Sequence, residues 1–428
     1  MKGDFSRDTF NLKKNFRRVL MQQGRVQLDA DWNEQSAILL HYLQTLAADL
    51  IGPHAGPGDG FLLELAKEGT TPEDLIIRAG RYYVDGILCE NDADVSYFEQ
   101  PNFRIANRNI LREGHFLFYL DVWERHVTCL EDESLCEVAL GGIDTTTRSQ
   151  VVWQVKERSL SSVERNVEMR KSTGRLKADV QFGESEDNLC NIAPDSRYRG
   201  AENQLYRVEV HTGNVNEFGE ELDLEPTFKW SRENGSVVFP IISITGSGET
   251  TEVRLAHLGR DNKFTLREGD WVEVVDDQYT LNNRVAPLLK VVAVDRDEMS
   301  VMLHGRTEIP ADANSDNHAL LRRWDQKPGN IVEVENTDQN NWLMLEDGIR
   351  IQFVRTEEGA ATYRTGDYWL IPARTVTGNI EWARDTNGNS LAQPPYSIEH
   401  HYAPLGIIKD GVLTSSRNGL KPIMVKAK

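Results

Sequence analysis

The side chains best suited to chemistry stand near the end of the chain, at Glu399, His400 and His401. Imidazole and carboxylate groups are frequent metal ligands. Adjacent residues of a strand point to opposite faces of a sheet, so His400 and His401 would not easily share one ion. The pattern therefore favours structural histidines, and we predict neither a metal site nor a cofactor.

The carboxylates of Asp121, Glu124 and Asp144 are the other catalytic candidates. A glycosidase holds two carboxyl groups roughly 5 to 10 Å apart in a cleft, and a sequence does not give that distance. Acidic residues are also so frequent here that choosing one pair would be arbitrary. The sequence contains no P-loop and no His-Glu-x-x-His, and Gly246-Ser247-Gly248 is too compact for the turn of a serine hydrolase. We therefore assign no catalytic residues, and hydrolysis of a cell-wall polymer is only a third hypothesis.

The nine tryptophans suggest carbohydrate binding, because aromatic faces stack on sugar rings. Five of them stand in segments that we expect to be strands, where a tryptophan is more often part of the core. Recognition of a glycan or a membrane surface is therefore kept as one hypothesis for the function, second to the one that the sequence blocks below imply. The five are Trp123, Trp153, Trp230, Trp271 and Trp369.

The four cysteines are Cys89, Cys129, Cys136 and Cys190, and they form no Cys-x-x-Cys pair. Zinc knuckles and redox motifs need such close pairs. We therefore expect buried free thiols.

The chain is acidic, and its 428 residues carry a net charge of −19. Such a chain repels phosphate backbones, which argues against a nucleic-acid partner. The sequence opens without the apolar run of a secretory signal, and the apolar-rich segment 37–51 is too short and too polar to span a membrane. We therefore expect a protein that is made and kept in the cytoplasm.

The first 56 residues predict an arm, a hairpin and a helix. Extended stretches at 17–21 and 25–29 flank a Gln-Gln-Gly sequence, which favours a hairpin. A helix is expected to begin near Asp31, the predicted N-cap, with Glu34 at the capping-box position, and to end at Gly52-Pro53. Apolar residues at helical spacing predict one buried stripe. Its members are Ile38, Leu39, Tyr42, Leu43 and Leu46.

The signals beyond residue 56 are mostly those of strands. Three dipeptides that accept positive φ angles predict hairpins: Asp85-Gly86, Asn234-Gly235 and Asp347-Gly348. Short strands at close spacing predict a small SH3-like barrel at 246–305. The polar segment 157–200 is expected to be a long surface loop or to be partly mobile.

The expected fold class is mainly β, with an N-terminal hairpin and helix followed by β-sandwich-like or barrel-like domains. A chain of 428 residues is too long for one simple core. We expect an arm, hairpin and helix at 1–56 and a β-rich domain at 57–245. The small SH3-like barrel at 246–305 follows, and a C-terminal β-rich segment at 306–428 is expected to pack back on 57–245.

A series of sequence blocks runs through nearly the whole chain, at 5–10, 19–34, 83–91, 119–126, 137–145, 228–235, 366–369, 372–374 and 400–405. Together they resemble a domain family of unassigned biochemical activity that recurs in gene clusters for phage-tail-like contractile injection systems. The resemblance implies a structural protein of the particle: a baseplate-associated part, an outer accessory, or an anchor to a membrane or cell surface. It also implies a homo-oligomer with three-fold or six-fold symmetry.

A charged arm ahead of a helix can link one subunit to the next. The expected partners are other copies of the chain and other proteins of the particle. The residues expected to make these assembly contacts are Phe5, Arg7, Phe10, Arg17, Arg18, Arg25 and Trp32.

Overall fold

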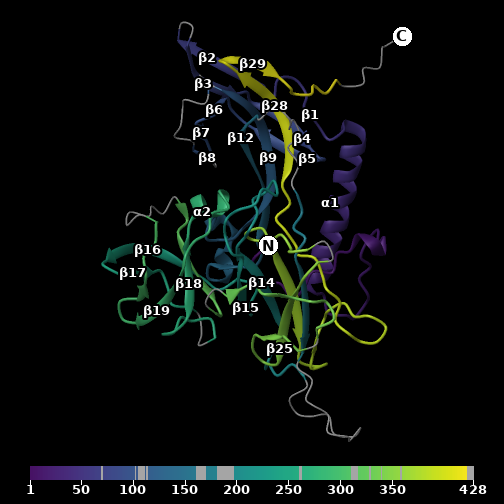
Figure 1. Ribbon diagram of the computed structural model, residues 1–428, viewed down its shortest axis with the longest axis vertical. Helices are drawn as coiled ribbons and strands as arrows, with labels where there is room; N and C mark the ends of the chain where they lie inside the picture. The colour runs from purple at the N-terminus through teal and green to yellow at the C-terminus, as the bar shows by residue number, and fades with distance from the viewer. Residues whose placement is uncertain are drawn as a thin grey trace, which may run out of the picture. The chain divides into compact units, whose positions relative to one another are not determined.

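The computed structural model describes residues 1–68, 71–101, 103–104, 111, 114–160, 170–180, 197–259, 263–309, 317–326, 329–338, 340–356 and 359–421. Strands dominate, which confirms the mainly β prediction (Figure 1). The chain divides into two compact units, each built from segments that are distant in sequence. The helix-bearing unit contains Thr9–Met169 and Ile398–Lys428, and the sheet-and-barrel unit contains Met1–Asp8 and Arg170–Ser397.

A four-stranded antiparallel sheet organises the helix-bearing unit. β9 (His115–Val127) lies between β12 (Arg148–Ser159) and β28 (His401–Lys409), and β29 (Val412–Ser415) completes the sheet. Figure 1 shows β28, in yellow, alongside β9. The C-terminal segment therefore completes a sheet that begins near residue 115.

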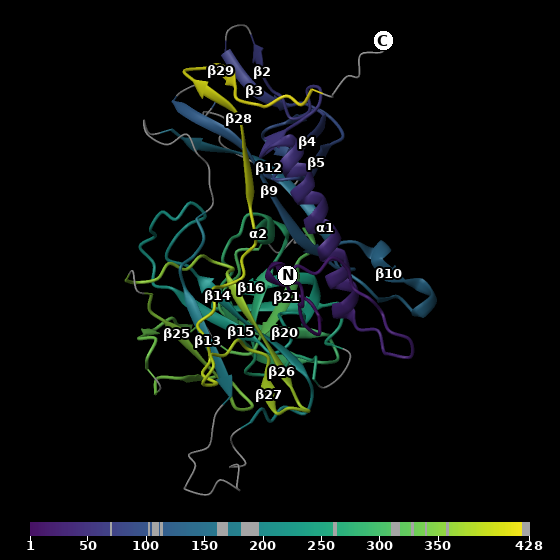
Figure 2. The ribbon, with the colours of Figure 1, turned by 90° about the vertical axis from the view of Figure 1, so that its right-hand side faces the viewer.

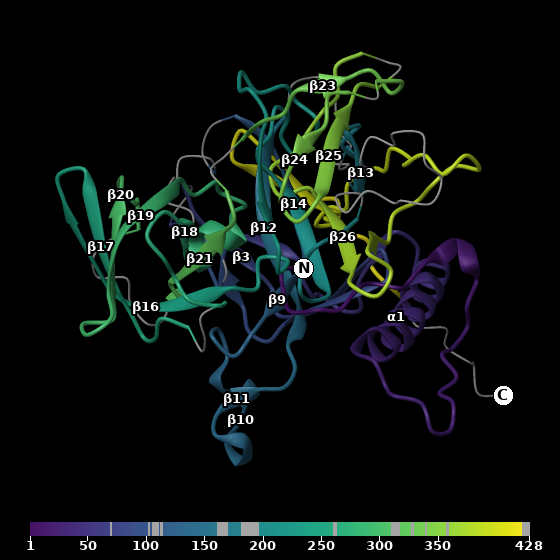
Figure 3. The same ribbon diagram turned by 90° about the horizontal axis from the view of Figure 1, so that it is seen from below.

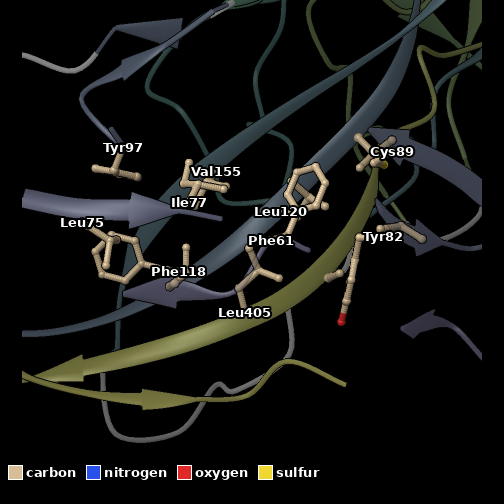
Figure 4. Packing of buried hydrophobic residues seen from close by; sticks show 14 of the residues in the cluster. Phe61, Leu75, Ile77, Tyr82, Cys89, Tyr97, Phe118, Leu120, Val155 and Leu405 are labelled. Atoms are coloured by element: carbon tan, nitrogen blue, oxygen red, sulfur yellow. The ribbon is translucent and has the colours of Figure 1, made fainter. Parts of the chain in front are cut away.

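One apolar cluster fills this unit. Strand alternation brings Phe118 and Leu120 from β9 to the same interior as Phe61, Tyr82 and Leu405 (Figure 4). All five side chains are at most 1 % exposed. The sheet is therefore covered on this face by the segments that precede β9 in the chain.

The smaller ladders of this unit include the sheet that supports helix α1 (Asp29–Ile51). That sheet has the order β1 (His54–Ala55), β4 (Gly80–Val84), β5 (Ile87–Asn91). Figure 2 shows α1 beside β4 and β5. The other ladders are β2 (Leu63–Glu68), β3 (Thr71–Ile77) and β6 (Val95–Ser96); β7 (Glu99–Gln100) with β8 (Phe103–Arg104); and β10 (Cys136–Glu137) with β11 (Ile143–Asp144).

Two sheets form a sandwich in the sheet-and-barrel unit. Side chains of both, including Tyr206, Trp230 and Phe353, join one apolar cluster, as the sandwich prediction expected. The first sheet has the order β22 (Gly329–Asn330), β15 (Thr227–Ser231), β14 (Gln204–Thr212), β26 (Tyr368–Arg374), β27 (Asn379–Ile380). The second has the order β13 (Arg175–Val180), β25 (Ile349–Val354), β23 (Glu333–Val334), with β24 (Leu343–Met344) also paired to β25.

Six strands of the same unit close into a small barrel with its own apolar interior. Figure 3 shows these strands grouped together, apart from β13 and β25 of the sandwich. The predicted barrel is confirmed, but its strands begin at 238 and end at 324, because β16 pairs with β21 to close it. The order is β16 (Val238–Ser247), β17 (Thr250–Leu255), β20 (Ser300–His304), β19 (Leu288–Asp295), β18 (Trp271–Val275), β21 (Leu320–Trp324). A short helix, α2 (Asp277–Leu281), follows β18.

The two units cross the predicted segment boundaries. Segment 57–245 is divided between them, because β9 and β12 share a sheet with β28 whereas β14 and β15 share one with β26. The predicted loop at 157–200 includes the end of β12 and all of β13, and the rest of it lies largely outside the described residues. Both the predicted boundaries and the predicted loop differ from the structure because strands in these segments pair with partners that are distant in sequence.

Two of the three predicted hairpins are confirmed. β4 pairs with β5 around Asp85-Gly86, and β24 pairs with β25 around Asp347-Gly348. The prediction for Asn234-Gly235 is wrong, since β15 pairs with β14 and β22 whereas β16 pairs with β17 and β21. Both residues have the expected positive φ, 52° and 66°. The turn thus reverses the chain as predicted but carries it from the sandwich into the barrel.

The N-terminal predictions need correction. The stretches at 17–21 and 25–29 are joined by a turn at Gly24 but are not assigned as strands. Helix α1 begins at Asp29 rather than Asp31, and its N-cap makes no side-chain hydrogen bond. Its predicted end is confirmed, because the N–H of Gly52 donates to the carbonyl oxygen of Ala48 (2.8 Å).

The predicted buried stripe of α1 is also wrong. Ile38 is 6 % exposed, but the other four members are between 42 % and 63 % exposed. The physical reason lies in the turn between β4 and β5. A Cβ added to Gly86 would lie 2.1 Å from the carbonyl oxygen of Gln44, so turn and helix touch backbone to backbone. A contact this close is possible only on the face of α1 that carries small and polar side chains, and the leucines therefore face away.

We expect Gly86→Ala to displace α1. Gly58→Ala is the matched control, because Gly58 also has a positive φ but has open space where its Cβ would be. Both variants carry the cost of a left-handed alanine, and Gly86→Ala should lose roughly 1–3 kcal/mol more from overpacking. Thermal unfolding and hydrogen exchange of residues 29–51 measure the difference. Equal behaviour of the two variants would contradict the close contact.

Candidate interaction surface at the N-terminal arm and helix α1

The N-terminal peptide, Met1–Asp8, is anchored inside the sheet-and-barrel unit. The α-amino group of Met1 donates a hydrogen bond to the hydroxyl of Tyr368 (3.0 Å). The side-chain amide of Asn234 donates to the carbonyl oxygens of Met1 (3.2 Å) and Gly3 (2.9 Å). Asn234 belongs to the turn that joins β15 to β16. That turn therefore anchors the peptide instead of closing a hairpin.

Buried charges surround Lys2. Its ammonium forms an ion pair with Glu209 (3.0 Å), and Glu209 also accepts a hydrogen bond from Arg207 (2.5 Å). Lys229 pairs with both Glu209 and Glu273, at 3.5 and 2.5 Å. Burial alone would raise the pKa of Glu209, but the neighbouring positive charges, that of Lys2 first, hold that pKa well below its usual range. Separating buried partners is costly, so the network specifies one position for the peptide.

The arm, residues 9–28, follows the peptide, and Figure 2 shows it as a loop at the lower end of α1. The hydroxyl of Thr9 donates to Glu34 (2.6 Å), and the backbone N–H of Val19 donates to the side chain of Gln35 (2.9 Å). These bonds hold the arm to the helix at separate points. They leave a set of apolar side chains exposed, namely Leu12, Phe16, Leu20, Met21, Val26 and Leu28.

The seven predicted contact residues fall into three places. Phe5 and Arg7 are half-buried in the N-terminal peptide, where Arg7 forms an ion pair with Glu381 (3.0 Å). Phe10 is half-buried where the arm meets α1, with its ring centre 6.0 Å from that of His41. Arg7 therefore binds within the chain. The exposed members are Arg17, Arg18 and Arg25 of the arm and Trp32 of α1, and they stay predicted partner contacts.

Helix α1 presents an apolar surface to solvent. Of its 23 residues it buries Ala30 and Ile38. Its two most exposed apolar side chains are Trp32 (74 %) and Leu50 (77 %). A contiguous exposed patch marks an interaction site, whereas single exposed apolar residues are ordinary. The whole set is Trp32, Leu39, Leu40, Tyr42, Leu43, Leu46 and Leu50.

The two histidines expected to be structural contact different carboxylates. Nδ1 of His400 lies 2.7 Å from Asp121, and Nδ1 of His401 lies 2.9 Å from Asp85. The buried Asp121 also pairs with Lys156 (2.6 Å). Burial would raise the pKa of Asp121, but His400 and Lys156 outweigh it and lower that pKa. Lys156 and His400 therefore stabilise the charged carboxylate of Asp121 in the middle of β9.

The three carboxylates considered for hydrolysis have separate surroundings. Asp121 is fully buried between its two basic partners. Glu124 lies three residues further along β9, which points it to the opposite face, and it accepts a hydrogen bond from Ser149 (2.5 Å). Asp144 is exposed on the two-stranded ladder of β10 and β11. This arrangement gives no support to a paired-carboxylate mechanism.

The other predicted side chains follow the strands. Trp123, Trp230 and Trp369 are core residues, at most 4 % exposed, while Trp153 and Trp271 are half-buried. Burial raises the pKa of the Cys89 thiol to about 12, as expected for an inert thiol. The remaining cysteines differ: Cys129 and Cys136 are half-buried, and Cys190 lies outside the described residues.

Other kinds of site have little support in the described part of the chain. Within it, no group of three or more histidine, cysteine, aspartate or glutamate side chains is placed to hold a metal ion. Neither of the described α-helices, α1 and α2, has the length and apolarity needed to cross a membrane. An open hollow on the barrel is lined by Glu249, His304, Gly305 and Arg306. Its arginine already donates to the carbonyl oxygen of Gly248 (2.6 Å).

One protein-family model matches the chain in two overlapping segments, residues 1–172 and 159–416. The chain belongs to the Family of unknown function (DUF6519). The DUF6519 match spans the arm, α1, the sandwich and the barrel. No curated protein and no solved structure matches this DUF6519 chain. The function of the DUF6519 fold must therefore be argued from its surface.

The sequence-based predictions missed two features of this region, the ion pair of Lys2 and the outward face of α1. Lys2 meets Glu209 through tertiary contacts alone, and no local pattern links them. The outward leucines of α1 did carry a signal, because Leu39, Leu43, Leu46 and Leu50 alternate by four and three residues. That spacing is typical of a helix that pairs with another helix.

We expect His211 to make the sheet-and-barrel unit less stable in acid. Burial lowers the pKa of this histidine, which stands beside the network on β14, from 6.5 to about 4. The unfolded chain therefore binds a proton that the folded chain resists between pH 6.5 and 4, and stability falls by up to roughly 3 kcal/mol as the pH drops through that window. His211→Asn should lose this part of the slope of unfolding free energy against pH.

Urea unfolding at pH 6.5, 5.5 and 4.5 measures that slope. Burial raises the pKa of Glu233 to about 7, which acts in the opposite direction, so the difference between variant and wild type is decisive. His304→Asn, at an exposed histidine of the barrel, is the control. An unchanged slope in His211→Asn would contradict the assignment.

Proposed function

We propose that this protein is a structural assembly component of a phage-tail-like contractile injection particle, either baseplate-associated or an outer accessory or anchoring part. The particle is inferred from the resemblance of the sequence blocks to the domain family of those gene clusters. The assembly role rests on one observation, the apolar surface that α1 and the arm leave exposed. A protein that works alone rarely leaves so large a patch in water, because covering it is favourable.

The charge of the arm supports the same role. Between residues 9 and 28 the chain has five basic residues, Lys13, Lys14, Arg17, Arg18 and Arg25, and no acidic residue. The whole chain nevertheless has a net charge of −19. A basic segment on an acidic protein is attracted to the acidic bodies of neighbouring copies, which steers their association. Apolar and basic side chains on one exposed arm are thus suited to docking on protein.

Recognition of a glycan or membrane surface is the alternative, and the described surface favours it less. Stacking on a sugar needs an exposed aromatic platform. All nine tryptophans are described, and Trp32 is the exposed one. It stands on α1 among leucines, where an apolar protein partner would cover it. We therefore place it in the assembly surface.

We expect charge reversal on the arm to remove the protein from particles. The variant Arg17→Glu, Arg18→Glu, Arg25→Glu changes three exposed side chains and leaves the anchored peptide intact. Particle-bound chain, measured by mass spectrometry of particles sedimented from the producing cells, should fall at least tenfold. The reason is that the arm would then repel the acidic surfaces it is expected to meet.

A matched control reverses three exposed basic residues of the barrel, Arg254, Lys290 and Arg296. This variant should sediment with particles as the wild type does. Wild-type chain that stays in the supernatant while other particle proteins sediment would refute the proposed function.

A further inference from the structure

Helix α1 carries an exposed seam with a seven-residue repeat. The seam positions are 32, 36, 39, 43, 46 and 50, separated alternately by four and three residues. Five are large and apolar, with exposed fractions of 74 % for Trp32, 52 % for Leu39, 58 % for Leu43, 42 % for Leu46 and 77 % for Leu50. The sixth is Ser36. A repeat of this kind over about 27 Å of helix is the pattern of the a and d positions of a coiled coil.

The seam is not needed for the fold of its own unit. The face that packs on the unit carries Ala30, Ile38 and Gln44, and a Cβ on Gly86 would collide with the backbone of Gln44. Helix α1 is therefore held by one face, and its heptad positions lie on another. The leucine-rich face of α1 is therefore left for a partner.

We propose that the seam packs against α1 of a second copy of this chain, in a parallel helical bundle; the inference rests on the proposed function. Knobs-into-holes packing requires a partner helix with the same repeat. Among the described residues α1 has 23 residues and α2 has five, so a second α1 is the complementary helix that this chain offers. The seam is uncharged, and an identical uncharged seam leaves no charge buried without a partner.

Charge complementarity selects the parallel orientation. The first turns of α1 are acidic, with Asp29, Asp31 and Glu34, and the arm that precedes them has five basic residues. Parallel packing brings the acidic first turns of two copies together, and with them both basic arms, so that each arm can neutralise the acidic residues of the other copy. An antiparallel pair would place those turns beside Asp49 of the partner and far from the partner's basic arm. The arrangement also suits rotational symmetry, in which every copy makes the same contacts.

The surface is large enough for a specific contact. Leu40 (50 % exposed) and Tyr42 (63 % exposed) widen the seam on either side. The seven apolar side chains of α1 together expose on the order of several hundred Å², and the six exposed apolar residues of the arm add to this area. That total approaches the roughly 800 Å² per partner of a standard interface.

The test measures the mass of the purified full chain by light scattering and sedimentation over a hundredfold range of concentration. The seam variant is Leu39→Gln, Leu43→Gln, Leu46→Gln, at exposed positions where glutamine is compatible with a helix. The control variant, Val138→Gln, Leu140→Gln, Val376→Gln, removes three exposed apolar side chains elsewhere. We expect the wild type and the control variant each to form an oligomer of the same size, and the seam variant to associate at least tenfold more weakly.

Single cysteines test the orientation. Leu50→Cys should give a disulfide-linked dimer under mild oxidation, because parallel packing puts both copies of this position at one level, whereas antiparallel packing would separate them by about 27 Å. Val376→Cys should not give such a dimer. A wild type that is monomeric throughout, or an oligomer that the seam variant leaves intact, would overturn the inference. Sedimentation of wild-type chain with particles is scored separately, so a failed seam and a failed particle role are told apart. A seam variant that is monomeric but still sediments with particles would leave the particle role standing.

Discussion

The pairing of β28 with β9 is the interaction on which the helix-bearing unit depends. It places the C-terminal segment against the middle of a sheet begun near residue 115, from His401 opposite Val122 to Lys409 opposite His115. The same pairing brings His400 to the buried Asp121, whose charge would otherwise be costly in this interior. Because β9 also pairs with β12 along its length, one strand has neighbours on both edges. The core that supports α1 is assembled around it.

The second constraint is the contact between Gly86 and the backbone of Gln44. It requires small and polar side chains on the inner face of α1 and thereby turns the leucine-rich face outward. This orientation leaves the isolated chain less stable than it could be, because exposed leucines contribute no hydrophobic stabilisation to its folding. In the proposed assembly, a partner that covers the seam would supply this missing stabilisation. The fold of the unit and the proposed assembly are therefore linked by the orientation of one helix.

The ion network around Lys2 has a different part in the architecture. The residues before the arm are bound by charge and by backbone hydrogen bonds to the sheet-and-barrel unit, whereas the arm touches α1 at separate points. Buried ion pairs are often poor sources of stability but good determinants of register. The network therefore defines where the arm begins, and the arm itself remains accessible to a partner. This division explains why Arg7 binds internally while Arg17 and Arg18 are exposed.

Sequence alone determined the local features: the mainly β composition, the existence and the end of α1, the small barrel, and the turns at Asp85-Gly86 and Asp347-Gly348. These depend on side-chain periodicity and on backbone angles that a few neighbouring residues set. Tertiary structure alone decided which strand follows the Asn234-Gly235 turn into which sheet, and which acids meet Lys2. It also decided that Leu39, Leu43 and Leu46 face outward, although their spacing was readable as a heptad. The reason is physical: periodicity alone predicts that the leucine-rich face of α1 is buried, whereas the close approach of the Gly86 turn selects the face with small and polar side chains.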